Sequence, residues 1–271
     1  MVLGAVSHTF LNEVETATGL AIQVESDDRL QSPLLARVQF APGGVPLHRV
    51  SYHPNVIEMA DYLIAFQCSF VLRLYALPVE ERDDLTDTPV ARSESMAWAQ
   101  THPASASLPH DRQLAFAEFL RTSLMSMLRS IPVGLWIDRD LCERFPALRH
   151  FQEQAIRRQI DTHAALLRPE IQRNIPKVPL GLNLAINAAF AKAWGNAPGA
   201  TGWTLPYLAV GALPGGESLL RRSEPLARSP ANDRQVIQAW ADELASPGTE
   251  TGFPFRAEFA EALRRTISGA E

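Results

Sequence analysis

Apolar residues are densest between Asp61 and Tyr75, where they lie all round a stretch of about four helical turns. A helix that is apolar on nearly every side is typical of one buried at the centre of a soluble fold. Gln67 and Arg73 interrupt the run, and it is shorter than the roughly 20 residues that span a bilayer. We therefore expect a central core helix here and no membrane span.

Three short stretches that precede this helix partly alternate apolar and polar residues, as strands do. They comprise residues 20–24, 34–40 and 47–52. A short helix over 8–20 comes before them, and the turn-forming residues 41–46 separate the last two strands. We predict a small antiparallel sheet of about three strands, packed by one face against the helix over 61–75.

Helical spacing of apolar residues dominates the second half of the chain. The expected helices cover residues 111–130, 146–167, 178–194, 233–245 and 255–267. The helix over 178–194 is apolar on most sides, and we expect it to pack face to face against the central helix. Residues 80–109 are polar and contain prolines, which indicates a flexible loop, and residues 196–230 are also expected to be loop-like.

These elements predict an α+β fold that is mostly α-helical, with a small N-terminal antiparallel sheet packed on a buried central helix. The chain has 271 residues and is 46% hydrophobic, which is enough for a substantial core. We expect a single domain over 1–271. Within it, 1–79 holds the sheet and central helix, 80–109 the flexible loop, and 110–271 the helical part.

The charge balance argues against nucleic acid as a partner. The chain has 25 basic and 30 acidic residues, a formal net charge of −5, and no basic cluster longer than Arg221-Arg222. Two cysteines, Cys68 and Cys142, make a disulfide framework improbable and favour a reducing compartment. Residues 1–10 lack the pattern of a signal peptide or membrane anchor. We expect a cytoplasmic protein without a membrane partner.

The segment Phe66-Gln67-Cys68-Ser69-Phe70 occupies the five positions of an HExxH motif, and residues 64–73 resemble the "IAHExgHilR" string of zinc metallopeptidases. In that family, the two histidines ligate zinc and the glutamate activates the metal-bound water. Here Phe66 and Phe70 stand at the ligand positions and Gln67 at that of the base. Phenylalanine cannot bind zinc and a neutral amide cannot take up a proton. The resemblance therefore implies a zincin-like scaffold without zinc hydrolase chemistry, and we expect neither metal nor cofactor.

Three amides and one arginine are candidates for a binding pocket. Asn183 and Asn187 form an i, i+4 pair, where peptidases of the glutamate-ligand type carry an acidic ligand. An unpaired buried amide costs about 1–3 kcal/mol, so we expect these two and Gln67 to be hydrogen-bonded. They form either a network that fixes helix register or the remnant of a ligand pocket. Arg73 is either an internal clamp or an anchor for an anionic ligand.

Cys68 is a candidate nucleophile, because cysteine hydrolases need a thiolate, a histidine and an oxyanion donor. No spacing selects a base among the candidate histidines, which are His48, His53, His102, His110, His150 and His163. An apolar helix raises the pKa of a thiol, which favours an inert core cysteine. The histidine spacings also fit no metal site.

These observations lead to three hypotheses. The first is a catalytically inactive, zincin-like pseudopeptidase that binds a protein or peptide partner. The second is a cysteine-dependent hydrolase that uses Cys68 and an unidentified histidine. The third is a structural or assembly subunit. The residues do not define the oligomeric state.

Overall fold

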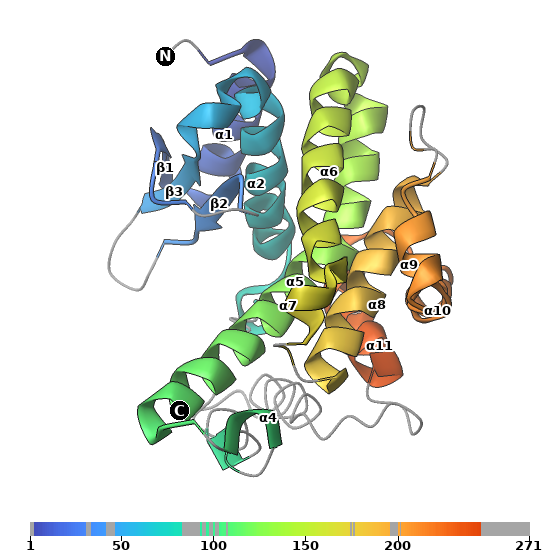
Figure 1. Cartoon of the computed structure of the whole chain (residues 1–271). Coiled ribbons are helices and arrows are strands. Elements are labelled where there is room, and N and C mark those ends of the chain that lie inside the picture. The colour runs from blue at the N-terminus through green and yellow to red at the C-terminus, as the bar shows by residue number, and fades with distance from the viewer. Residues whose placement is uncertain are drawn as a thin grey trace. The chain divides into compact units, whose positions relative to one another are not determined.

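The computed structural model describes residues 3–30, 34–41, 47–82, 93, 96, 97, 100, 103–106, 108–173, 175, 177–195, 200 and 202–244. The chain forms two compact units. Unit 1 contains Met1–Arg82, Gly134–His163 and Ser229–Ala231, and unit 2 contains Asp83–Val133, Ala164–Arg228 and Asn232–Glu271. The described residues are mostly helical with one small sheet, which confirms the predicted α+β class (Figure 1). The single domain over 1–271 stays a prediction.

Unit 1 holds the sheet, the central helix and the last part of a long helix. Its elements are α1 Ala5–Thr18, β1 Ala21–Ser26, β2 Ala36–Gln39, β3 Leu47–Tyr52, the 3-10 helix η1 Pro54–Met59, α2 Ala60–Tyr75, η2 Val79–Glu81, the end of α5 His110–Arg144, η3 Pro146–Leu148 and α6 Arg149–His163. The helix expected over 8–20 and the strands expected before residue 53 are therefore present within a few residues of their predicted bounds.

The sheet is mixed rather than purely antiparallel. Its order is β1-β3-β2, and β2 pairs antiparallel with β3 as expected. By contrast, β1 runs parallel to β3. The chain between Ser26 and Leu47 contains β2 and supplies the long crossover that a parallel pair requires. Val50 lies in the middle strand opposite Val24 and Val38, and it is fully buried.

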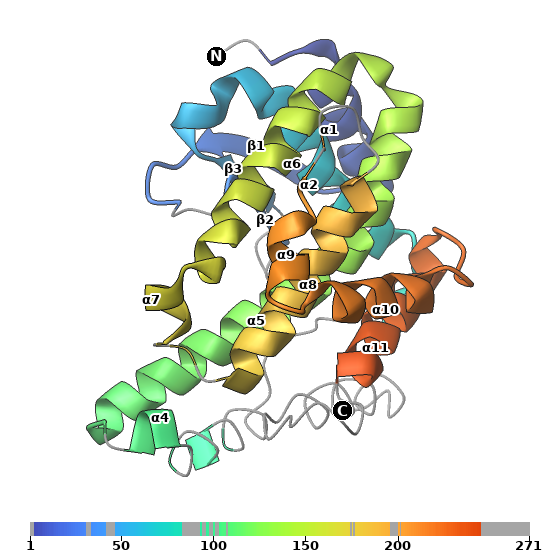
Figure 2. The same ribbon diagram turned by 45° about the vertical axis from the view of Figure 1, so that its right-hand side comes forward.

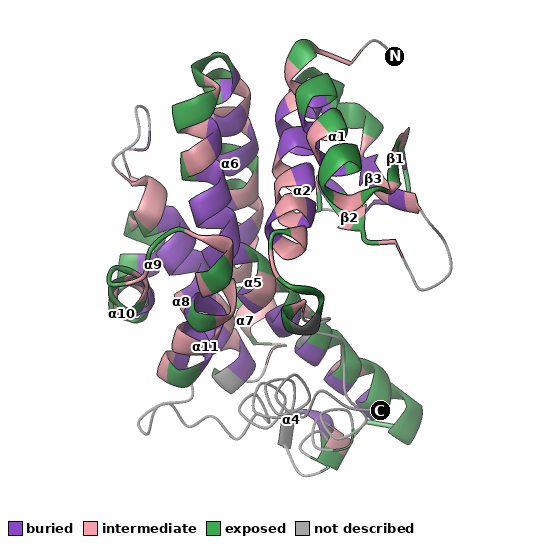
Figure 3. Cartoon of the chain, turned by 180° about the vertical axis from the view of Figure 1, so that it is seen from behind, coloured by how far each residue is buried: buried purple, intermediate pink, exposed green. Residues whose placement is uncertain are grey.

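Helix α2 is the core element that the apolar run predicts. It packs against α1 and against strands β2 and β3, and buried residues, purple in Figure 3, lie along much of its length. Asp61 in its first turn also caps α1, because its Oδ1 accepts hydrogen bonds from Gly4 N at 2.8 Å and Ser7 Oγ at 2.5 Å. A Cβ at Gly4 would overlap the Asp61 carboxylate.

Helix α5 does not end at residue 130, as the sequence predicts, but continues through Pro132 to Arg144. Residues 131–138 are all buried. A proline inside a helix removes one backbone hydrogen bond, and burial of this apolar segment offsets that cost. Within α5, the residues before Gly134 belong to unit 2, and the residues from Gly134 to Arg144 belong to unit 1.

The regular elements in the described part of unit 2 are all helices. Its further elements are α4 Pro103–Ala106, η4 Ala164–Leu167, α7 Pro169–Gln172, α8 Lys177–Trp194, α9 Leu205–Ala209, α10 Leu213–Ser223 and α11 Asp233–Leu244, with η5 Pro230–Asn232 at the boundary between the units. The predicted loop over 196–230 is wrong where α9 and α10 form. Pro206 and Pro214 stand in the first turn of these helices, where proline is tolerated.

Helix α10 packs closely against α8 (Figure 2). The predicted helix over 178–194 corresponds to α8, which lies in unit 2, whereas α2 lies in unit 1. Their face-to-face packing stays a prediction. The helix expected over 255–267 lies outside the described residues, as does most of the loop expected over 80–109.

Candidate functional site

The residues at the HExxH positions have packing roles. The Phe66 and Phe70 rings meet edge to face, with centroids 5.3 Å apart. Gly134 of α5 leaves room for them, since a Cβ there would lie 3.1 Å from the Phe66 ring. Gln67 Nε2 donates to the carbonyl oxygen of Ala36 at 3.2 Å and so ties α2 to β2. No cluster of three or more histidine, cysteine or acidic side chains that would suit a metal ion occurs among the described residues.

Cys68 lies fully buried on α2. Burial raises the pKa of its thiol to about 12, with a smaller contribution from the negative charge of Glu13. At neutral pH the thiol is therefore protonated and shielded from solvent, which does not suit a nucleophile. Two candidate bases are buried as well, and burial lowers the pKa of His48 and brings that of His163 to about 4.

The asparagine pair of α8 forms the bond that its spacing predicts. Asn187 Nδ2 donates to Asn183 Oδ1 at 2.7 Å, and Asn183 Nδ2 contacts Met127 Sδ at 3.2 Å. Gln67, by contrast, bonds to the sheet of unit 1. The three amides therefore belong to two separate local networks. The bond between the two asparagines is internal to α8, and the contact with Met127 is the one that joins α8 to α5.

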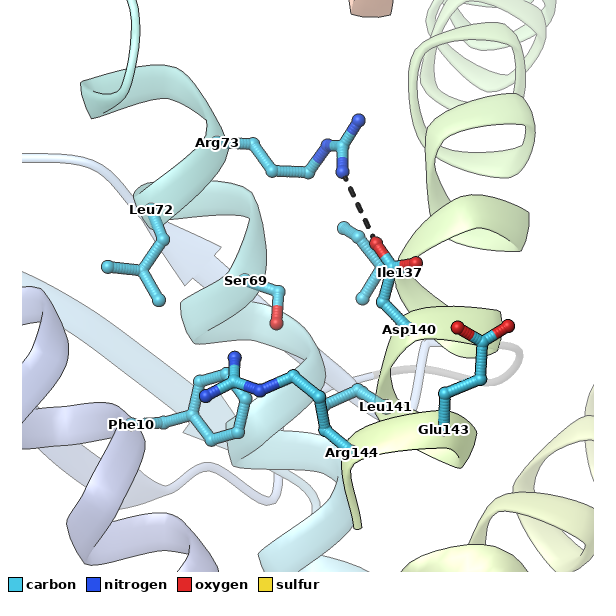
Figure 4. Close-up of a pocket in the computed structure, with 9 residues that line it drawn as sticks. All are labelled: Phe10, Ser69, Leu72, Arg73, Ile137, Asp140, Leu141, Glu143 and Arg144. Carbon is cyan, nitrogen blue, oxygen red and sulfur yellow. Dashed lines mark ion pairs between the residues drawn. The ribbon is translucent and has the colours of Figure 1, made fainter. Parts of the chain in front are cut away.

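A hollow in unit 1 brings charged and apolar side chains together (Figure 4). Its volume is about 280 Å³. The residues that line it come from α1, α2 and α5, and they are Phe10, Ser69, Leu72, Arg73, Ile137, Asp140, Leu141, Glu143 and Arg144. Of the candidate binding residues predicted from sequence, Arg73 alone lines this hollow.

Arg73 reaches across the hollow from α2 toward α5 (Figure 4). Its guanidinium Nη1 lies 3.7 Å from Asp140 Oδ2, and its Cζ lies 5.7 Å from the centre of the Trp136 ring. The Arg73 side chain is 10% exposed, whereas that of Asp140 is 39% exposed. The pair fits the internal clamp, and the Asp140 side chain is the more exposed of the two.

A second arginine covers the apolar side of the hollow. The Arg144 guanidinium lies 5.3 Å from the centre of the Phe10 ring and donates to Glu13 Oε1 at 2.9 Å. Ser69 Oγ donates to the Ala65 carbonyl, which leaves its lone pairs as acceptors. The hollow thus offers cationic, anionic and apolar surface within one small volume.

Sequence reasoning missed the α5 side of this hollow. Asp140, Glu143 and Arg144 follow the point where the helix was expected to end. The i, i+4 spacing of Asp140 and Arg144 is the available signal that these side chains share one helical face.

Comparisons with protein-family models, with curated proteins and with solved structures find no match for this chain. Among the described residues, the helical stretch Pro54–Tyr75 is long and apolar enough to cross a membrane. Core helices of soluble proteins can meet the same criterion, and more than half of the most apolar part of this stretch is buried. The expected absence of a membrane partner stays a prediction.

Proposed function

We propose that this protein is a catalytically inactive pseudopeptidase on a zincin-like scaffold, and that it binds a peptide segment of a partner protein in the hollow of unit 1. The observation that carries the proposal is the lining of that hollow. Arg73 can donate to a peptide carbonyl, and Asp140 can accept from a peptide N–H group. Phe10 and Leu72 provide apolar surface for a side chain.

The size of the hollow supports a peptide rather than a large cofactor. Its volume of about 280 Å³ lies just below the range of about 300–1,000 Å³ that small-molecule sites occupy. It therefore suits one or two side chains of a ligand whose remaining residues lie on the surface.

The positions of the degenerate motif support binding without peptidase chemistry. Phe66 and Phe70 pack against each other, and Gln67 is hydrogen-bonded to the backbone of Ala36 in β2. The cysteine hydrolase has less support, because the buried Cys68 thiol has a pKa of about 12. The structural or assembly subunit stays an alternative that predicts a permanent partner.

The proposal is tested by selecting heptapeptides from a random phage library on the purified full chain. The affinity of a selected peptide is then measured by fluorescence polarisation. Asp140→Asn removes a charge at the hollow and is expected to weaken binding about tenfold or more, because hydrogen bonds to charged groups contribute about 1.5–3 kcal/mol. Asp161→Asn is the matched control, since Asp161 is exposed on α6 and does not line the hollow.

Two results would overturn the proposal. One is a library from which no peptide is enriched, or a selected peptide that binds Asp140→Asn and a hollow-filling Ser69→Trp variant as tightly as the parent. The other is stoichiometric metal, found by elemental analysis of protein purified without chelator or affinity tag, together with cleavage of the bound peptide.

A further inference from the structure

A carboxyl group lies in the core of unit 1 where three helices meet. Asp138 of α5 is 2% exposed. The Tyr62 hydroxyl of α2 donates to its Oδ1 at 2.7 Å, and Gln152 Nε2 of α6 donates to the same oxygen at 3.0 Å. Gln152 Nε2 also donates to the Asp138 backbone carbonyl at 2.7 Å. One carboxyl group therefore links α2, α5 and α6.

The carboxyl group of Asp138 has no cationic partner among the described residues. The arginines on the surrounding helices are directed elsewhere: Arg73 toward Asp140, Arg158 toward Glu58 of η1, and Arg149 toward the Cys142 sulfur. Arg139 and Arg157 are exposed. The acidic Asp61 of α2 caps α1, and Tyr62 itself stays neutral because its pKa is raised well above 10.

Burial raises the pKa of Asp138 to about 7, although the hydrogen bonds from Tyr62 and Gln152 lower it. A buried charge without a counter-ion is costly, and a neutral acid that accepts the same hydrogen bonds costs less. Near neutral pH, Asp138 therefore exchanges between its protonated form, which suits the closed core, and its ionised form, which favours contact with water.

This junction lies on α2 and α5, two of the three helices that line the hollow. Ile137, Asp140 and Leu141 flank Asp138 on α5 and line the hollow, while Ser69 and Arg73 line it from the helix that carries Tyr62. A change in how α2 is held against α5 therefore changes the distance between the hollow's walls.

We propose that Asp138 is a proton switch whose ionisation loosens the α2–α5 junction and opens the peptide-binding hollow, an inference that rests on the proposed function for the identity of the ligand. In the step, the O–H bond of the protonated Asp138 carboxyl group breaks and a new O–H bond forms on the solvent water that takes up the proton, which leaves a carboxylate. The protonated form holds the hollow in its closed-core geometry. Loss of the proton favours conformations in which water reaches the carboxylate.

Nuclear magnetic resonance of the ligand-free full chain tests this switch directly. The ¹³C carboxyl resonance of Asp138 is followed from about pH 4 to about pH 8.5, together with the backbone amides of Ser69, Arg73 and Asp140. All four are expected to change with one shared midpoint near 7. In Asp138→Asn the three amides are expected to lose this transition and to resemble the low-pH parent.

Two further variants make the outcome specific. Tyr62→Phe removes one donor to the charged form and is expected to raise the Asp138 midpoint by about half a pH unit or more. Asp161→Asn retains every histidine and Asp138, so its transition is expected to match the parent. A midpoint below pH 5 for Asp138, or hollow amides that do not follow it, would overturn the switch. Because no peptide is present, this outcome is independent of whether the proposed binding function is correct.

Discussion

Gly216 of α10 lies directly against Ala188 of α8. A Cβ at position 216 would come within 2.8 Å of the Ala188 Cβ and 2.5 Å of the Ala189 backbone nitrogen. The obstructing atoms are mainly backbone, so they cannot rotate away as a flexible side chain could. The close contact between these two helices of unit 2 therefore depends on a residue without a side chain.

Gly216→Ala is expected to destabilise unit 2 by about 1–3 kcal/mol, the usual cost of overpacking. Urea denaturation followed by circular dichroism measures this change. Gly181→Ala is the matched control, because a Cβ at Gly181 of α8 meets nothing within 4 Å. That control is expected to stabilise the protein by about 0.4–1 kcal/mol, and equal effects of the two substitutions would contradict the packing argument.

Cys68 is expected to resist iodoacetamide under native conditions. With a pKa of about 12, its thiol is ionised to about one part in ten thousand at pH 8, and it is also buried. Cys142 is half-buried and serves as the internal control. Mass spectrometry after labelling should find Cys142 modified first, with both cysteines modified in urea. If Cys68 were labelled as fast as Cys142, the result would support the hypothesis of a cysteine-dependent hydrolase.

Stability is expected to fall as pH rises toward neutrality. The pKa of Asp138 is about 7 in the folded state and near 3.8 when unfolded, so the folded state binds more protons between these values. This group therefore lowers the free energy of unfolding by about 1.4 kcal/mol per pH unit from about pH 4 to about pH 7, and no further above that. Urea denaturation at several pH values measures the slope. Asp138→Asn should flatten it, and an unchanged slope in that variant would assign the effect to other groups.

Asp61→Ala is expected to destabilise the start of α1 by about 0.5–2 kcal/mol, the range for loss of a helix cap. The alanine removes the acceptor for both Gly4 N and Ser7 Oγ. Amide hydrogen exchange should show lost protection in the first turn of α1. Asp61→Asn keeps an acceptor oxygen and is expected to retain most of the protection, so equal losses in the two variants would indicate that charge rather than the bond is needed.

The periodicity of apolar residues located most of the elements near the sheet and in the helical core. Residues 61–75 and 178–194 correspond closely to α2 and α8, because long apolar stretches of helical length leave few alternatives. The pattern of apolar residues does not show whether two neighbouring strands are parallel or antiparallel. Alternation in residues 20–24 shows that two faces differ, but it is identical for a parallel and an antiparallel neighbour.

At two places, prolines and glycines predict a break or a loop, but tertiary packing keeps the chain helical. Pro132 lies inside α5, and α10 begins in the segment Leu213-Pro214-Gly215-Gly216. Local preference favours a break or a loop at both places. Burial of residues 131–138 offsets that preference in α5, and the close approach to α8 does so in α10.

The candidate site was only partly predictable, because its contacts join residues far apart in the chain. Arg73 stands out as a charge in an apolar helix, and the sequence leaves open whether its partner belongs to the chain or to a ligand. Nothing in the sequence identifies Asp140 as that partner, or Tyr62 and Gln152 as the partners of Asp138. An isolated aspartate in a helical pattern is usually exposed, and only the fold shows that Asp138 is buried.

The division of unit 1 into separate chain segments has a consequence for synthesis on the ribosome. The sheet and α2 are translated first, but α6, the last α-helix of their unit, ends at His163. At about 5–20 residues per second, the intervening stretch of roughly eighty residues takes about 4–16 seconds to translate. During that time the nascent α2 lacks the helices that cover part of its apolar surface, so this is the interval in which the nascent chain is most exposed to chaperones and to aggregation.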